Sequence, residues 1–270
     1  SPGYKKFEEY VQNIDQFVKN ASAFVDECQL ILSVKHQQRI RGGGSNRKRN
    51  SNDASEEHIE KIEETPIQTD VLDRLVKLLD AIPTINFACP EADQIVELQI
   101  EIENFERATR HFLESGKTSL QEFNDLISLG ESFGVELPSL KFLRRVRSRI
   151  IWLKDFTIIK NGGDPSDTKS FTLKDLKKFQ IDGQSILGAS DLETYRQLEI
   201  FVIESEAFEK QVKELLSYTL IDQLSLERLD GYTRKLQTLV LFLYQETFDQ
   251  LVTLTDKFEM ISKLQDFKIS

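Results

Sequence analysis

A helix–corner–helix pattern that recurs about every 50 residues constrains the fold of this chain more than any other feature. In one copy, a short apolar run with helical spacing leads into the corner GESFGVELP, residues 130–138, and a long amphipathic run follows. Helix through this corner would cost about 1 kcal/mol at each of Gly130 and Gly134 and about 3 kcal/mol at Pro138. We therefore expect these residues to form the corner of an αα-hairpin.

Two further copies support this interpretation. The earlier one has a short helix over residues 71–82, and its long helix begins at Pro90, because proline is tolerated in the first turn of a helix. The later one begins at Thr172, with Gly183 placed 53 residues after Gly130. In its corner, Ser190 takes roughly the place of Pro138 and is expected to act as an N-cap.

A fourth, shorter copy begins at Ser225. We expect Gly231 to end its first helix, because glycine is a poor helix former. A last long helix would then carry Leu236, Val240 and Leu243 and continue to Ile261.

A hairpin of this kind cannot bury its own apolar face and must stack on its neighbours. The sequence therefore predicts an all-α fold: an elongated array of helical hairpins with long helices, spectrin-like or solenoid-like. Composition agrees, because 39% hydrophobic residues suffice for a core, and 18 Phe with only six Pro favour helices with few corners.

Residues 7–32 carry apolar side chains at alternating intervals of four and three. This spacing predicts a long helix whose broad apolar face packs within the chain, and a coiled-coil seam is the alternative. The stripe comprises Phe7, Val11, Ile14, Val18, Ala21, Val25, Cys28 and Leu32, widened by Tyr10, Phe17, Phe24 and Ile31.

Three segments follow from these patterns: a first long helix (1–40), a flexible basic Gly/Ser linker (41–57) and the hairpin repeats (58–270). The run Gly42-Gly43-Gly44-Ser45 resembles an engineered joint, and a native loop is the alternative. Nearby, Arg47, Lys48 and Arg49 form a candidate nuclear-import patch, or a solvated loop without a role. The ends of the chain suggest a segment of a longer protein.

Several classes of partner are disfavoured. A net charge of −10 would repel duplex nucleic acid over a broad surface, and no apolar run of 18 or more residues indicates a membrane span. The two cysteines, Cys28 and Cys89, provide neither a disulfide framework nor a cysteine zinc site, so a reducing compartment fits best.

The sequence offers no catalytic constellation. The three histidines, His36, His58 and His111, lack metal-ligand spacing, and neither a phosphate-binding loop nor a nucleophile elbow occurs. Carboxylates such as Glu97 and Glu101 follow the spacing of a solvated helix face. We expect no cofactor, metal or small-molecule substrate in this segment.

The densest local charge is the segment KFLRRVRSR, residues 141–149. This basic helix could contact an acidic protein partner or, weakly, nucleic-acid phosphate, and internal pairing with acidic helices is the alternative. Its candidate partner-binding residues are Lys141, Arg144, Arg145, Arg147 and Arg149.

One copy of the repeat carries a distinctive set of residues: Ser119, Leu120, Phe123, Gly130, Glu131, Ser132, Val135, Leu137, Pro138, Leu140 and Trp152. The unit LLDAIPTINFACPEADQIVELQIEIENFERA is similar to a preceding copy. In these residues the repeat resembles the PLU-type helical domain that follows the catalytic core in the jumonji/ARID histone lysine demethylases.

This resemblance implies a nuclear chromatin regulator. Its family uses Fe(II) and 2-oxoglutarate in a jumonji core, with zinc in a separate finger, and none of those ligands matches a position here. Some fungal relatives have degenerate cores and act in histone deacetylase complexes, so the parent's activity stays open. We expect a non-catalytic scaffold that docks chromatin-complex subunits or spaces reader and catalytic domains. The alternative is a cytoplasmic spectrin-like or tethering rod that self-associates through its first or last long helix.

Overall fold

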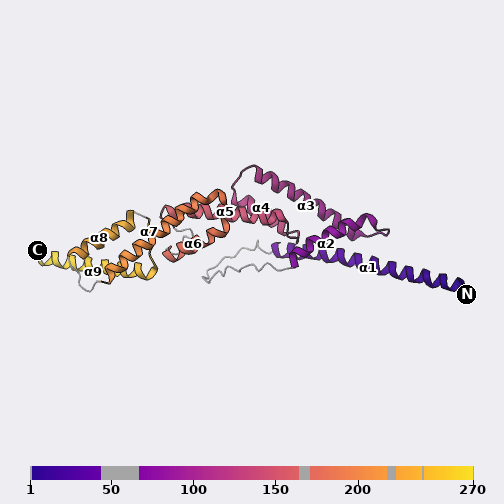
Figure 1. Ribbon diagram of the computed structural model, residues 1–270, viewed down its shortest axis with the longest axis horizontal. Helices are drawn as coiled ribbons and strands as arrows, with labels where there is room; N and C mark the ends of the chain where they lie inside the picture. The colour runs from indigo at the N-terminus through magenta and orange to yellow at the C-terminus, as the bar shows by residue number, and fades with distance from the viewer. Residues whose placement is uncertain (1, 44–66, 164–170, 218–222, 239, 270) are drawn as a thin grey trace. The chain divides into compact units, whose positions relative to one another are not determined.

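The computed structural model describes residues 2–43, 67–163, 171–217, 223–238 and 240–269, and these ranges are helical apart from short connections (Figure 1). They contain no strand, so the predicted all-α class is confirmed, while stacking into a solenoid stays a prediction. The chain divides into two compact units, Ser1–Arg147 and Ser148–Ser270, and the division falls within the residue range of helix α5. The elements are α1 (Pro2–Gly43), α2 (Ile67–Ala81), η2 (Ile82–Thr84), α3 (Pro90–Glu114), α4 (Leu120–Glu131), α5 (Pro138–Lys160), α6 (Leu173–Ile186), η3 (Ala189–Asp191), α7 (Leu192–Leu216), α8 (Gln223–Thr238) and α9 (Gln245–Ile269).

Local capping chemistry sets the starts of several helices. The Ser119 side chain accepts a hydrogen bond from the backbone N–H of Glu122, which caps α4. Thr172 and Asp175 form a reciprocal capping box at the start of α6. Pro90 occupies the first turn of α3. The helix starts expected at Thr172 and Pro90 are confirmed.

In the first unit, the second half of α1 packs against α2 and α3. Cys28 and Ile31 of α1 are fully buried or nearly so. The guanidinium of Arg74 donates two hydrogen bonds to the Glu27 carboxylate, at 2.5 and 2.8 Å, and Lys35 lies 2.7 Å from Glu101. Apolar burial therefore holds this three-helix packing together, with ion pairs along its edge.

The corner between α4 and α5 turns at Gly134, whose φ of +72° lies in the left-handed region that favours glycine. A Cβ atom here would also lie 2.8 Å from Val34 Cγ1 and 3.0 Å from the backbone nitrogen of Lys35, so the corner packs directly on α1. Gly130 instead lies inside α4, where the expectation that it forms the corner is wrong. Its lack of a side chain lets the Phe105 ring approach, with Cζ 2.8 Å from the position of a Cβ.

One core of the second unit forms around Trp152. Its ring stacks on Phe179 with centroids 4.5 Å apart, and its indole nitrogen donates a hydrogen bond to the Phe179 carbonyl at 3.2 Å. Gly183 lies inside α6, where a Cβ would be 2.8 Å from Trp152 Cζ2. The glycine therefore makes room for the indole, and the helix continues to Ile186.

The last part of the chain differs from the expected fourth copy. Helix α8 continues through Gly231 to Thr238, so the predicted break at this glycine is wrong. Burial of Leu229 and contact of the half-buried Tyr232 with the same apolar cluster offset the glycine's poor helix propensity. The final helix begins only at Gln245, and Val240 and Leu243 precede it. The Leu243 carbonyl accepts a hydrogen bond from the Leu173 N–H at 2.9 Å.

The corner between α6 and α7 also differs from expectation. Gly188 caps the short η3 helix, and Asp191 directly precedes α7. Ser190 lies within η3, so the predicted N-cap role of Ser190 is wrong. The Asp191 carboxylate accepts a hydrogen bond from the Gly188 N–H at 3.2 Å and thereby fixes the turn.

Candidate functional site

The predicted basic helix is the first half of α5, and three of its five cationic side chains make internal contacts. Arg144 bridges Glu131 at the end of α4 and Glu136 in the corner, with N–O distances of 2.8 and 2.7 Å. Arg147 Nε donates a hydrogen bond to the Asn124 side-chain oxygen at 2.6 Å. These contacts favour the alternative of internal pairing for this part of the helix.

Arg149 and Asp191, which both belong to the second unit, make the closest of these pairs. Its Nε and one terminal nitrogen donate to the two carboxylate oxygens at 2.7 and 2.5 Å, a bidentate geometry that fixes both side chains. The Asp191 side chain is only 5% exposed. Because Arg149 stabilises the carboxylate, the pKa of Asp191 is lowered despite burial, which acts in the opposite direction.

The two remaining cations, Lys141 and Arg145, are exposed and make no ion pair within the described part of the chain. They lie four residues apart, and so on one side of α5. The neighbouring Phe142 is 53% exposed. The structure therefore leaves this edge of the predicted basic helix free to contact a partner.

The apolar stripe of α1 divides into a covered and an uncovered half. Every residue from Gly3 to Asn20 is exposed, so the expected burial of the whole stripe is wrong for its first half. At the boundary between the two halves, Phe24 and the still exposed Phe17 contact the Phe87 ring edge to face, each with centroids 6.0 Å apart. The uncovered large apolar side chains are Tyr4, Phe7, Tyr10, Val11, Ile14, Phe17 and Val18, which are 41–68% exposed.

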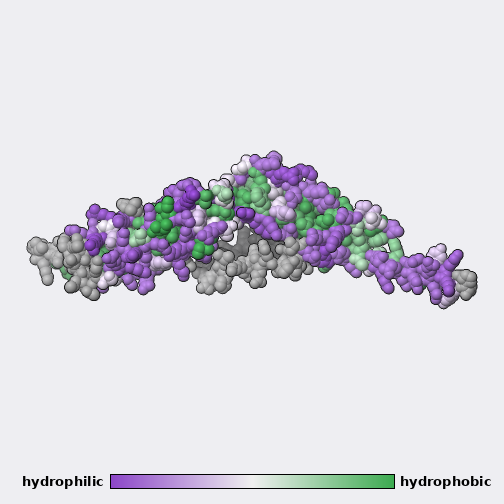
Figure 2. Space-filling view, in the orientation of Figure 1, coloured by the Kyte–Doolittle hydropathy of each residue, from purple (hydrophilic) through white to green (hydrophobic). Residues whose placement is uncertain are grey.

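The residues of this uncovered stripe are spaced three and four apart, so they lie on one side of the helix. The first half of α1 lies at the right-hand end of Figure 2, and its visible face is mostly hydrophilic. From the exposed fractions, the stripe presents on the order of 700 Å² of apolar surface, more than the largest patch on a typical monomer. Sequence periodicity identified all of these residues except Tyr4, but it could not show that α2 and α3 cover only the second half.

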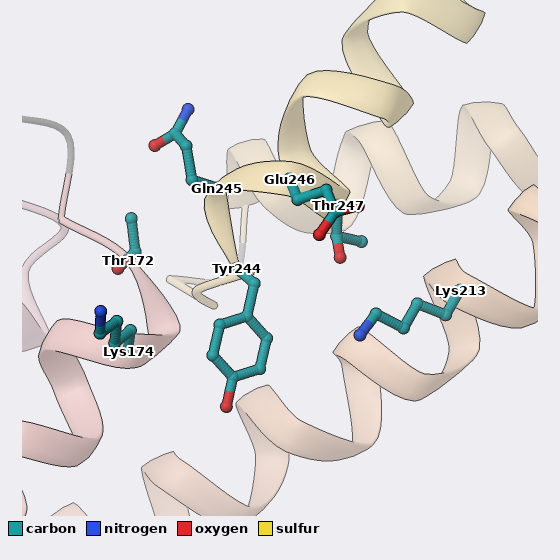
Figure 3. Close-up of a pocket in the computed structure, with 7 residues that line it drawn as sticks. All are labelled: Thr172, Lys174, Lys213, Tyr244, Gln245, Glu246 and Thr247. Carbon is teal, nitrogen blue, oxygen red and sulfur yellow. The ribbon is translucent and has the colours of Figure 1, made fainter.

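A pocket of about 390 Å³ lies in the second unit, at the starts of α6 and α9 (Figure 3). Lys213 reaches from α7 toward Tyr244, and its ammonium lies 5.5 Å from the ring centroid. Lys177 lies 5.6 Å from the same centroid, and its pKa is raised by Glu206 first and by Tyr244 second. Two cations thus accompany one aromatic ring.

The carboxylate of Glu209 occupies the position beside this pocket where an anion would be stabilised by the start of α9. It accepts hydrogen bonds from the Tyr244 N–H at 3.1 Å and the Thr247 hydroxyl at 2.5 Å, and it lies 3.2 Å from Lys213 Nζ. The Glu209 carboxylate therefore already fills the position that a bound anion would take, and its contacts join α7 to the start of α9. Sequence reasoning missed Glu209 because it looks like one more acidic residue on a solvated helix face.

The two cysteines are brought together in the first unit and are both buried free thiols. The pKa of Cys28 is raised to about 11, mainly by burial and then by Cys89, so the thiol stays protonated at neutral pH. Within the described ranges, no group of three or more His, Cys, Asp or Glu side chains is placed to hold a metal ion. His111 is exposed in the last turn of α3.

The predicted linker and import patch lie at or beyond the end of the described range 2–43. Helix α1 extends to Gly43, into the segment predicted to be a linker. The candidate import patch of Arg47, Lys48 and Arg49 lies outside the described residues. In the ranges that the structure covers, none of the helices has the length and apolar character needed to span a membrane.

These observations define a class of protein: an all-α protein whose α1 stripe and α5 cations lie on the surface of the described ranges. The chain belongs to the PLU-1-like protein family, which matches residues 4–269. This match confirms the resemblance to the PLU-type domain of jumonji/ARID histone lysine demethylases and associates the chain with chromatin-related proteins. Comparison with curated proteins and with solved structures found no match.

Proposed function

We propose that this chain is a non-catalytic helical scaffold of a nuclear chromatin-modifying protein, and that it docks partner subunits or spaces reader and catalytic domains. Family membership over nearly the whole chain supports the chromatin setting. Any Fe(II), 2-oxoglutarate or zinc would be bound elsewhere in the full-length protein. The partners are protein subunits of a chromatin complex, including those of a histone deacetylase complex.

The observation that carries this proposal is the uncovered apolar stripe of α1. In the second half of the same helix, two helices cover the corresponding face and bury Cys28 and Ile31. The first half presents side chains of the same kind without such a cover, from Tyr4 to Val18. Exposed apolar patches of this size mark protein-interaction sites, so the stripe is the main docking surface.

The test is affinity purification of the full-length protein that contains this chain from nuclear extract. One variant carries Phe7→Glu and Ile14→Glu, which place two charges on the stripe. The matched control carries Gln12→Glu and Gln16→Glu, which add the same charge on the opposite side of α1. Both pairs are exposed, so circular dichroism should show an unchanged fold.

The proposal predicts that the stripe variant loses chromatin-complex subunits that the control retains. Retention of all nuclear partners by both variants would contradict it. Recovery of cytoskeletal or vesicle proteins alone would favour the tethering rod instead, and sedimentation of the purified chain would then show self-association through a terminal helix.

A further inference from the structure

A surface groove of about 630 Å³ runs between α3 and the first half of α5, within the first unit. Its α5 wall is formed by Pro138, Phe142 and Val146, which are spaced four residues apart and so form one row along about 12 Å of helix. Leu113 contributes from α3. With 53% of Phe142 exposed, the groove presents an apolar lining to solvent.

Unpaired cations border this groove on both sides. Arg110 lines it on α3, and Lys141 and Arg145 occupy the next row of α5, beside Phe142 and Val146. All three are exposed, and none makes an ion pair within the described part of the chain. The other arginines of α5, by contrast, are paired internally.

Two carboxylates also line the groove, and they affect what can bind there. Glu106 accepts a hydrogen bond from the Ser139 hydroxyl at 2.5 Å and so anchors the start of α5 to α3. Glu114 lies one helical turn beyond Arg110 and is exposed. These negative charges would repel a continuous phosphate backbone, while leaving the cationic edge on α5 available.

We propose that this groove binds an acidic amphipathic helix of a protein partner. Two or three apolar side chains at helical spacing would enter between Leu113 and Phe142, and Asp or Glu on the flanks would pair with Arg110, Lys141 and Arg145. This inference rests on the proposed docking function and names one partner chemistry for a second surface. The apolar lining and the carboxylates favour a peptide over nucleic acid.

The experiment is a display selection on the purified chain. The probe is a library of 16-residue helical peptides with an apolar face of fixed spacing and randomised flanking positions that admit acidic, basic and neutral residues equally. Enriched peptides should carry an excess of Asp and Glu on the flanks. Their affinity should fall at least tenfold for Phe142→Ala and at least tenfold for Lys141→Glu with Arg145→Glu.

The control variant is Lys5→Glu with Lys77→Glu, which makes the same change in charge on exposed positions of α1 and α2 outside the groove. It should retain wild-type affinity, apart from a small loss that added salt removes. Because Phe142, Lys141 and Arg145 are exposed, the groove variants should keep the helical circular dichroism of the parent chain.

Three results would overturn the inference: no enrichment, enrichment without an acidic bias, or equal binding to the Phe142→Ala chain. A labelled DNA duplex that binds the chain and loses affinity with the same charge reversals would make the groove a nucleic-acid surface and overturn it too. The selection uses only the purified chain and peptides, so its outcome is independent of whether the α1 stripe recruits chromatin subunits.

Discussion

The corner between α4 and α5 and the corner between α6 and α7 occupy equivalent places in the repeat, yet they are built differently. The first turns at Gly134 with a positive φ and starts its second helix at Pro138. In the second, Leu187 and Gly188 are extended and Asp191 holds the turn. Equivalent positions therefore do not require equivalent turns.

What the two hairpins share is a glycine inside the shorter helix. Gly130 admits Phe105, and Gly183, 53 residues later, admits Trp152, each at a distance that a Cβ would obstruct. An arginine of α5 also stabilises each corner: Arg144 the first and Arg149 the second. The two hairpins therefore share close helix packing at a glycine and an ion pair between an arginine of α5 and the corner, while the path of the turn differs.

Removing the ring that fills each glycine's space should have the largest effect. Trp152→Ala and Phe105→Ala should each lower the free energy of unfolding by about 4 kcal/mol, because both rings are almost fully buried. Guanidinium denaturation followed by circular dichroism measures this. Phe142→Ala is the control and should cost under about 0.5 kcal/mol. A small cost at only one of the two rings would break the equivalence of the hairpins.

Adding a methyl group at the shared glycines should have the next largest effect. Gly130→Ala and Gly183→Ala should each cost about 2 kcal/mol, because the Cβ would overlap an aromatic ring. Gly231→Ala is a matched control inside α8, where nothing lies within 4 Å, and it should stabilise the chain by up to about 1 kcal/mol. Equal effects at all three positions in denaturation would show that packing is not the reason for glycine.

Breaking the Arg149–Asp191 ion pair of the second corner should have a smaller, pH-dependent effect on stability. Asp191→Asn should cost about 1.5 kcal/mol at pH 7, because it removes a charge-assisted bidentate pair. The folded-state pKa of Asp191 lies below its ordinary value of 3.8, so the contribution is complete above that pH and is lost as the pH falls through the folded value. The stability difference, measured by urea denaturation from pH 7 to pH 3, should therefore shrink at the acidic end. A constant difference would mean that the pair is not the cause.

The smallest effect is expected at Pro138, the first residue of α5. Pro138→Ala should cost less than about 1 kcal/mol, because Gly134 sets the turn and only the greater freedom of the unfolded chain is added. The thermal midpoint is a sufficient measurement. A loss of stability above about 1 kcal/mol would mean that Pro138, rather than Gly134, determines the first corner.

The starts of the helices could be predicted from the sequence because their causes are local. Ser119, Thr172 and Pro90 act on backbone groups within three residues, and the apolar spacing between them needs no knowledge of tertiary contacts. The apolar spacing of residues 7–32 likewise predicted the long helix α1, but it predicted burial for a stripe whose first half is exposed.

The roles of Gly130, Gly183, Gly231 and Glu209 could not be predicted, because their causes are tertiary. A helical glycine costs about 1 kcal/mol locally, and only the partner ring shows why the helix tolerates it. Likewise, Glu209 is distinguished from other helix carboxylates only by its contact with Tyr244, which lies 35 residues later in the chain and directly precedes α9. The internal pairing of Arg144 and Arg149 depends on contacts that sequence spacing does not specify.

The uncovered half of α1 links folding to recognition. A helix of this length without tertiary cover is marginally stable in water, so residues 3–20 should exchange their amide hydrogens rapidly while the half packed on α2 and α3 remains protected. Docking would slow that exchange, and the free energy spent on ordering the helix would be subtracted from the affinity. The chain would then hold its partner by a contact that is extensive in area yet readily released.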